Sequence, residues 1–209
     1  MATAYRTVQQ QACLEIVINK SRFIGYCFPV SEEGEAQQRL EEIRKQHWDA
    51  THNCFAYSIG ERGSIARYSD DGEPGGTAGL PMMEVLRQKN VTNVLCVVTR
   101  YFGGVLLGAG GLVRAYSRAV SEAVEAAGIV SMRPCICYKV VLDYSRWGVL
   151  EGLLRSQGNL QDVEFTDCIT AAVMIEAERA EAFEKLVTER TDGRVCPQAV
   201  GEAYGVFPI

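Results

Sequence analysis

The 209-residue sequence lacks the features of a secreted, membrane-spanning or broadly nucleic-acid-coating protein. It contains no run of about 18 or more apolar residues that could span a membrane. Its first ten residues have neither the charged start nor the apolar stretch of a signal peptide. Basic residues are not in excess, since 21 Lys and Arg against 26 Asp and Glu give a net charge of −5. We therefore expect a cytoplasmic globular protein without membrane association, on which any nucleic-acid surface is local.

Metal and disulfide signals are also weak. The chain has eight cysteines but no C-x-x-C pair, and it has only two histidines. Neither a disulfide framework nor a zinc site is therefore expected. Five of the cysteines lie in apolar, strand-like runs, where a reduced thiol behaves as a small hydrophobic group. The spacings of an EF-hand, a Walker A loop and a Rossmann fingerprint are missing as well, so no metal or cofactor is predicted.

The pattern over residues 1–130 predicts a β-rich domain with two late helices. The expected elements are a hairpin (13–18 and 22–28), a capped helix from Ser31 toward Trp48, strands at 54–59 and ending at Tyr68, a helix through Leu86, a buried strand (94–99) and a helix from about Gly111 to Ala127. The buried strand and the last helix are separated by a loop rich in glycine. Gly128 is the expected end of the last helix.

The pattern restarts at Arg133-Pro134, so we expect a second domain at residues 131–209. Its strands and helices follow the order βαββαβ, which is typical of a ferredoxin-like fold. Residues 1–130 carry 13 basic and 14 acidic side chains, whereas residues 131–209 carry 8 and 12. The second domain is therefore the acidic one, and the net charge argues less strongly against polyanion binding by the first.

Glycines mark two loops of the first domain. One loop holds Gly72, Gly75, Gly76 and Gly79, and the other holds Gly103, Gly104, Gly108, Gly110 and Gly111. The second loop links a buried strand to a helix, where amide N–H groups and the helix dipole can hold a phosphate. Arg100 before the loop and Arg114 after it would add guanidinium contacts to the same anion. Alternatively, the glycines serve only tight turns and close packing.

The first glycine loop also carries Asp70, Asp71 and Glu73. Such a segment is typical of a rigid solvated turn, but it also suits carboxylates that face a cation, a ligand amine or a hydroxyl donor. His52 shares a strand face with Cys54, because residues two apart on a strand point the same way. His52 could form a nucleophilic pair with this thiol, bind zinc, or orient a ligand or a neighbouring group, and the last interpretation is favoured.

Aromatic residues lie beside the two arginines. Tyr101 and Phe102 follow Arg100, and Tyr116 follows Arg114 by two positions. Aromatic rings next to guanidinium groups are typical of surfaces on which bases stack. Tyr101 and Tyr116 are therefore candidate stacking residues, although positions in the core would also explain them.

Three segments together resemble the signature motifs of the IMPACT/YigZ family. They are residues 52–57, residues 69–79 followed by Pro81, and residues 99–116. The resemblance covers the whole chain and implies an α+β protein. Its first domain would have the ribosomal protein S5 domain 2-like fold, a four-stranded sheet backed by helices, and its second domain would be ferredoxin-like. The RWD domain that precedes the motif domain in eukaryotic members is not found in this sequence.

The resemblance also implies a role in translation. The two folds together resemble domains IV and V of elongation factor G, which suggests contact with RNA or the ribosome. The eukaryotic relatives regulate translation by binding the activator of an initiation-factor kinase, a role that does not transfer without the RWD domain. The first hypothesis is a translation-associated regulator whose first domain binds RNA, the ribosome or another phosphate-bearing ligand. Its candidate binding residues are His52, Asp71, Gly75, Gly76, Arg100, Gly103, Gly104, Gly108, Gly110, Gly111 and Arg114.

Two other hypotheses remain open from the sequence. One is an enzyme acting on a small phosphorylated or carboxylated substrate, with His52 as acid/base and Asp71 or Glu73 as its partner. Kinases of small metabolites share the superfamily fold, but Gly110-Gly111-Leu112 stands where their serines are expected. The other is a protein–protein regulator of translational stress signalling that uses the sheet surface or the acidic second domain. A binding protein is expected rather than an enzyme.

Overall fold

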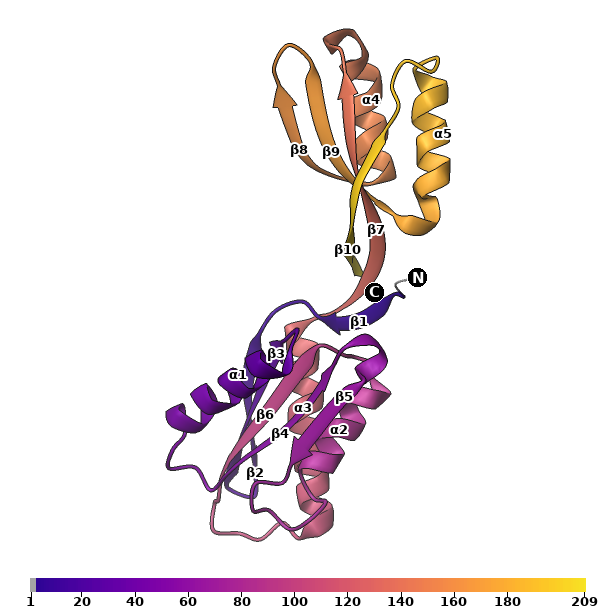
Figure 1. Cartoon of the computed structure of the whole chain (residues 1–209). Coiled ribbons are helices and arrows are strands. Elements are labelled where there is room, and N and C mark those ends of the chain that lie inside the picture. The colour runs from indigo at the N-terminus through magenta and orange to yellow at the C-terminus, as the bar shows by residue number, and fades with distance from the viewer. Residues whose placement is uncertain (1–2) are drawn as a thin grey trace. The chain divides into compact units, whose positions relative to one another are not determined.

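The computed structural model of the chain describes residues 3–209 and divides into two compact units (Figure 1). The motif unit comprises residues 5–131 together with 208–209, and the C-terminal unit comprises residues 132–207 with Thr3 and Ala4. Met1 and Ala2, which begin the N-terminal stretch considered above, lie outside the described residues. No helix within residues 3–209 is long and apolar enough to cross a membrane.

The motif unit contains a five-stranded antiparallel sheet in the order β2-β3-β6-β4-β5. Its strands are β2 (Ala12–Ile18), β3 (Ser21–Pro29), β4 (His52–Ile59), β5 (Ile65–Ser69) and β6 (Val94–Tyr101). The hairpin predicted at the start of the chain is formed by β2 and β3. The four-stranded sheet implied by the resemblance is corrected to five strands. The additional strand is β5, whose residues Ile65 to Ser69 pair with β4.

Helices cover both faces of this sheet (Figure 1). The helices are α1 (Glu33–Gln46), α2 (Gly79–Gln88) and α3 (Ala109–Ala127). α1 packs on one face, and α2 and α3 pack side by side on the other. The remaining elements are β1 (Tyr5–Val8), which the sequence did not predict, and the short 3-10 helix η1 (Glu61–Gly63). The amide of Thr92 donates to the carbonyl of Arg6 in β1 at 2.9 Å.

The central strand β6 buries side chains on both of its faces. Leu95 and Val97 lie in the core with α1, whereas Cys96 and Val98 lie in the core with α2 and α3. Because side chains alternate along a strand, Arg100 faces the same side as Cys96 and Val98. The strand was expected to end at residue 99 but continues to Tyr101, so Arg100 belongs to the sheet and not to the following loop.

The end of α1 differs from the prediction. The helix was expected to continue toward Trp48, with this residue near the apolar stripe, but it ends at Gln46 and Trp48 is 83% exposed. His47 takes the inner position instead. Its Nε2 lies 2.6 Å from the Tyr26 hydroxyl and its Nδ1 lies 2.9 Å from the Tyr101 hydroxyl. These two hydrogen bonds account for the turn that directs Trp48 outward.

The C-terminal unit has the predicted βαββαβ order. Its elements are β7 (Ile129–Leu142), α4 (Tyr144–Gln157), β8 (Asn159–Phe165), β9 (Ile169–Glu176), the short η2 (Ala177–Arg179), α5 (Ala180–Arg190) and β10 (Gln198–Pro208). The strands pair in the order β7-β9-β8, and β10 also pairs with β7. Alternate residues of β7 and β9 pack against α4 and α5 to form one core, so the chain has the α+β fold expected from the sequence.

Candidate functional site

The fold brings the three motif segments to one edge of the motif-unit sheet. His52 at the start of β4 pairs with Arg100 near the end of β6, and Phe55 pairs with Ser69 at the end of β5. The loops that follow β5 and β6 lead directly into α2 and α3. We call this region, with residues 47–52, 69–80 and 100–114 and the β2–β3 turn, the motif edge. It lies at the lower end of the motif unit in Figure 1.

A buried carboxylate lies at the centre of the motif edge. The side chain of Glu73 is only 2% exposed, and its Oε1 accepts hydrogen bonds from Arg100 Nη1 at 2.7 Å and the Tyr116 hydroxyl at 2.6 Å. Its Oε2 lies 3.7 Å from Nε2 of His52. These four residues, which we call the Glu73 network, come from β4, β6, α3 and the loop before α2. The network therefore ties the three motif segments together.

The geometry of Arg100 differs from that of an open phosphate ligand. Its guanidinium group is paired with Glu73 and lies between two aromatic rings, 5.4 Å from the Phe23 centroid and 5.5 Å from the Phe102 centroid. Its buried Nε makes no hydrogen bond with any described residue. The positive charge of Arg100 is thus balanced by Glu73. A counter-charge is needed here because Arg100 lies on the buried face of β6.

His52 is held by hydrogen-bonding groups on both sides of its ring. Nδ1 lies 2.8 Å from the carbonyl oxygen of Asp71, so this nitrogen carries the donated proton and Nε2 faces Glu73. Cys54 donates to the carbonyl of Asp70 at 3.0 Å. Burial raises the pKa of its thiol to about 12, so at neutral pH the thiol is protonated. This arrangement does not fit a nucleophilic Cys–His pair, which needs a thiolate.

The remaining acids of the first glycine loop accept hydrogen bonds from backbone amides, Asp70 within the loop and the start of α2, and Asp71 in β4. The carboxylate of Asp70 accepts hydrogen bonds from the amides of Gly76, Ala78 and Gly79 at 2.8, 3.0 and 2.8 Å. Burial raises the pKa of Asp70, but these amide hydrogen bonds outweigh it and leave the pKa below its ordinary value. Asp71 accepts from the amide of Asn53 at 2.6 Å. The Asp70 carboxylate therefore already occupies the start of α2, and the amide of Gly76 is one of its donors. Gly75, the preceding residue, is exposed.

Metal binding is not supported by this arrangement. Within residues 3–209, no group of three or more His, Cys, Asp or Glu side chains is placed to hold a metal ion. Each of the three loop carboxylates instead accepts a hydrogen bond from the protein itself.

The second glycine loop begins with a close approach between backbones. A Cβ added to Gly103 would lie 2.0 Å from the carbonyl carbon of Lys20 in the β2–β3 turn. The Gly103 amide also donates to the Ser21 hydroxyl at 3.1 Å. Gly104 follows with φ +80°, a conformation that residues with a Cβ rarely adopt. These two glycines therefore position the loop.

The start of α3 is open, in contrast to that of α2. Its N-cap residue Gly108 has no side chain to cap the helix, and the first turn contains no acidic residue. Gly108 and Gly110 are exposed, and Gly111 follows one residue later. Arg114 is also exposed and makes no hydrogen bond or ion pair with any described residue. The first amides of α3 and Arg114 thus offer donors to an anion.

A small pocket lies beside this helix start. Its volume is about 260 Å³, and it is lined by Ile18, Asn19, Leu107, Gly111, Arg114, Ala115 and Arg118. Lys20, next to Asn19 in the β2–β3 turn, is exposed and has no ion-pair partner among the described residues. We call this pocket, with the start of α3 and Lys20, the anion pocket. The candidate residues thus separate into the buried Glu73 network and the anion pocket.

The two candidate stacking residues are not placed for that role. Tyr116 is fully buried, and its ring meets Phe23 edge-on with centroids 5.3 Å apart, so it has no face for a base. The ring of Tyr101 lies under the guanidinium of Arg22 at 5.2 Å. The exposed aromatic residues of the motif edge are Trp48 and Phe102. Phe102 was noted in the sequence only as a neighbour of Arg100, and Trp48 was expected near the helix stripe.

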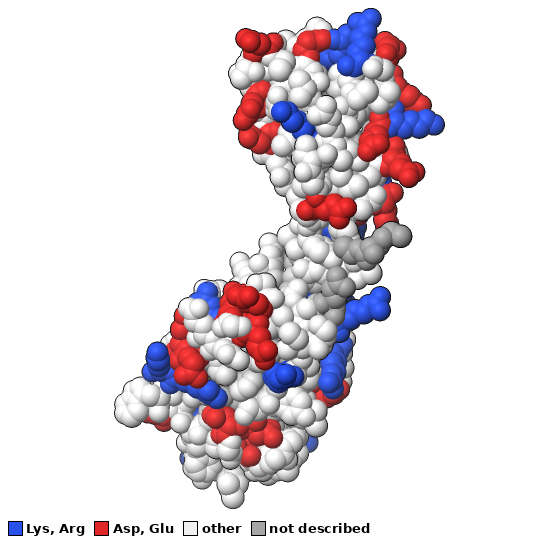
Figure 2. Space-filling view, viewed as in Figure 1, with Lys and Arg blue, Asp and Glu red and all other residues white. Residues whose placement is uncertain are grey.

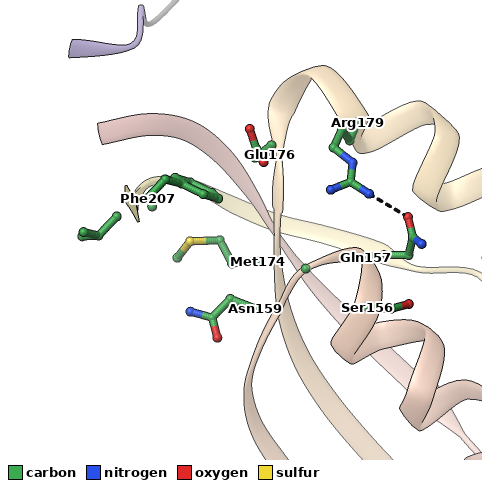
Figure 3. A pocket seen from close by; sticks show the side chains of 10 residues that line it. Ser156, Gln157, Asn159, Met174, Glu176, Arg179 and Phe207 are labelled. Atoms are coloured by element: carbon green, nitrogen blue, oxygen red, sulfur yellow. Dashed lines mark hydrogen bonds between the residues drawn. The ribbon is translucent and has the colours of Figure 1, made fainter. Parts of the chain in front are cut away.

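A larger cavity of about 420 Å³ lies within the C-terminal unit (Figure 3). It is lined by Ser156, Gln157, Gly158, Asn159, Met174, Glu176, Arg179, Gly205, Val206 and Phe207. Its charged groups are paired: Arg179 donates to Gln157 at 2.9 Å, and Arg133 donates to Glu176 at 3.0 Å. No motif singled out in the sequence contributes to this cavity.

Comparisons with known proteins agree with the resemblance read from the motifs. Residues 19–124 match the family described as the Impact N-terminal domain, and residues 140–194 match a domain of unknown function. The chain is 45% identical to "IMPACT family member YvyE" of Bacillus subtilis over 93% of its own length and 90% of that protein. It is 32% identical to "IMPACT family member YigZ" of Escherichia coli over 88% and 92% of the two chains.

Two further similarities define how far the relationship extends. "Protein IMPACT homolog" of Dictyostelium discoideum is 41% identical over 43% of this chain and 26% of that protein. A crystal structure of a protein described as hypothetical matches with a TM-score of 0.62 and 29% identity, over 96% of this chain and 99% of that one. Both units of the chain thus have counterparts in a protein of known structure.

Proposed function

Because the chain belongs to the IMPACT family, we propose that it acts in the cytoplasm as a translation-associated regulator that binds RNA, including RNA of the ribosome, through its motif unit. The phosphates would lie in the anion pocket, at the first amides of α3 and the side chains of Arg114 and Lys20. Phosphate oxygens suit such a site because they accept hydrogen bonds from amides and guanidinium groups and complement the positive end of the helix dipole.

The observation that carries this proposal is the contrast between the two helix starts. Asp70 places a carboxylate on the amides that begin α2, so that helix start is internally satisfied. The start of α3 has no such carboxylate, although its glycine-rich sequence and exposure leave room for one. A bound phosphate would do at α3 what Asp70 does at α2.

The Glu73 network supports this function indirectly. It neutralises Arg100, fixes the acidic loop against β4 and β6, and holds the end of β6 from which the second glycine loop departs. We therefore propose that His52, Asp71, Glu73 and Arg100 build the site without contacting the ligand. An enzymatic role for His52 receives little support, because both of its ring nitrogens face protein groups.

The proposal is tested by placing a carboxylate at the open helix start. Ala109→Asp should favour the helix but exclude a phosphate, because a negative charge in the first turn interacts well with the helix dipole. Arg114→Ala removes one cation. Both variants should weaken RNA binding, and Arg114→Ala should lower the slope of log affinity against log salt by about 0.7 to 0.9 for each lost phosphate contact.

Arg87→Ala is the matched control. It removes an exposed arginine from the last turn of α2, where Arg87 pairs with Glu84. RNA affinity measured by fluorescence anisotropy should be unchanged in this variant. If Ala109→Asp and Arg114→Ala bind RNA as well as the control does, the anion pocket is not the phosphate site.

A further inference from the structure

Exposed apolar side chains gather at the motif edge. Eight large hydrophobic residues of the motif unit are exposed, and five of them lie here: Trp48, Leu80, Phe102, Val105 and Leu106. The exposed fraction reaches 83% for Trp48 and 85% for Leu106. On the face drawn in Figure 2, the lower part of the motif unit shows a group of Asp and Glu side chains with uncharged surface below it. Apolar groups concentrated in this way mark an interaction surface.

Hydrogen bonds place the two exposed aromatic residues and the anion pocket along one strip. The amide of Phe102 donates to Thr51 Oγ1 at 3.1 Å, and Tyr101 donates to Asp49 at 3.1 Å, so the turn that carries Trp48 lies against the end of β6. On the other side of Phe102, Gly103 packs on the β2–β3 turn, which also lines the anion pocket. Aromatic, apolar and cationic groups therefore follow one another along the edge.

The charges around the anion pocket favour a polyanion. Lys20 and Arg114 are exposed and have no ion-pair partner among residues 3–209. The carboxylates of Asp49 and Asp70 lie elsewhere on the edge, and no acidic residue that the structure describes lines the anion pocket. An unpaired positive charge next to exposed aromatic rings matches the two parts of a nucleotide, the phosphate and the base.

The ring of Phe102 packs against a side chain that is itself held in place. The guanidinium of Arg100 lies 5.5 Å from its centroid, and Arg100 is in turn fixed by Glu73 and by the ring of Phe23. The ring of Phe102 is still 46% exposed. The Glu73 network thus acts through Arg100 to position an aromatic surface beside the anion pocket.

We infer that the RNA bound at the motif edge is single-stranded, and that its unpaired bases stack on Trp48 and Phe102 while its phosphates occupy the anion pocket. The inference rests on the proposed function and goes beyond it by naming the class of RNA and the stacking residues. A duplex keeps its base faces inside the helix and offers nothing to these rings, whereas an unpaired strand exposes them.

The test compares two RNAs and three variants of the full chain. The probes are a labelled oligouridylate of about 12 nucleotides and an RNA duplex with the same number of phosphates. The oligouridylate should bind the unchanged protein more tightly than the duplex does. Trp48→Ala and Phe102→Ala should each weaken its binding about 5- to 150-fold, the range expected for one stacked base, without changing the salt slope. Phe165→Ala, which removes a ring that is 57% exposed from the C-terminal unit, should have no effect.

Fluorescence supplies a second measurement. The chain contains two tryptophans, so Trp147→Phe leaves Trp48 as the reporter. Stacking of a base on Trp48 should quench its emission when the oligouridylate binds, and the duplex should quench it less.

The outcomes separate the inference from the function on which it rests. Equal affinity for both RNAs, sensitive to Arg114→Ala but not to Trp48→Ala or Phe102→Ala, would overturn the inference and leave the phosphate site standing. Absence of binding to either RNA would overturn both. Aromatic variants that bind RNA normally but lose retention on RNA-free ribosomal proteins would assign the strip to a protein partner, which also overturns the inference.

Discussion

Removal of the Glu73 carboxylate should destabilise the motif unit more than any surface substitution. Glu73→Ala leaves Arg100 buried between Phe23 and Phe102 without a counter-charge, and it leaves the Tyr116 hydroxyl without its acceptor. A buried ion that has lost its partner costs about 3 to 5 kcal/mol of folding free energy. A buried hydroxyl without an acceptor adds to this cost.

Two further variants bracket this value. Tyr116→Phe removes only one hydrogen bond to the carboxylate and should cost about 1 to 3 kcal/mol, so it remains informative if Glu73→Ala does not fold. Glu122→Ala is the matched control, because Glu122 lies on the exposed side of α3 and pairs with Arg118 at 2.6 Å, four residues earlier. An exposed pair of this kind contributes about 0.3 to 0.5 kcal/mol.

Native-state hydrogen exchange of the full chain is the suitable assay, because it reports each unit separately. The amides of β6 lie in the centre of the motif-unit sheet and should exchange only when that unit opens. A loss of about 3 to 5 kcal/mol corresponds to exchange about 150 to 5,000 times faster in Glu73→Ala. Amides of β9 in the C-terminal unit serve as an internal reference. If β6 exchanges at nearly the same rate in Glu73→Ala and Glu122→Ala, the network is not the structural centre of the motif edge.

Three other predictions concern single groups of the motif edge. Cys54 should resist alkylation at pH 8 while exposed Cys13 reacts, as measured by peptide mass spectrometry. Because the folded pKa of Cys54 is about 12 and an unfolded thiol ionises near pH 9, its contribution to stability should be lost as pH rises through that interval. Asp70→Asn should lower the free energy of unfolding by about 0.5 to 2 kcal/mol at pH 7, measured by urea unfolding, and by less in acid. The reason is that a carboxylate with a lowered pKa stabilises the fold above its unfolded pKa and loses this effect as pH falls through its folded pKa. An equal loss at pH 3 would contradict this. Gly103→Ala should lower the melting temperature because its Cβ would collide with the backbone of the β2–β3 turn, whereas Gly75→Ala, with no atom within 4 Å, should fold normally.

Periodic patterns predicted the elements and could also have placed two of the misjudged residues. The predicted hairpin and the βαββαβ order are confirmed because strands and helices show their periods directly in the sequence. The same rules put Arg100 on the strand face of Cys96 and Val98, and Tyr116 one turn after Leu112 on the buried stripe of α3. Both residues are buried, as the strand and helix periodicities indicate. The prediction of a surface role rested on the guanidinium group of Arg100 and the aromatic ring of Tyr116.

The rest of the site depends on contacts that no local pattern encodes. The ion pair between Glu73 and Arg100 joins residues 27 positions apart, and the hydrogen bond from Tyr116 to Glu73 joins residues 43 positions apart. The exposure of Trp48 follows from the inward turn of His47 between Tyr26 and Tyr101, which come from two different strands. Sequence reasoning identified the segments that form the edge, but the division into a buried network and an open pocket requires the tertiary structure.

The most direct test of the central claim is an NMR titration of the isotopically labelled full chain with the oligouridylate. The account predicts that the amide signals of residues 109–111 shift together with the side-chain signals of Arg114 and Trp48, whereas the amides of Ala78 and Gly79, which already bind Asp70, remain in place. Shifts confined to the C-terminal unit, or shifts at the start of α2 without any at the start of α3, would contradict it.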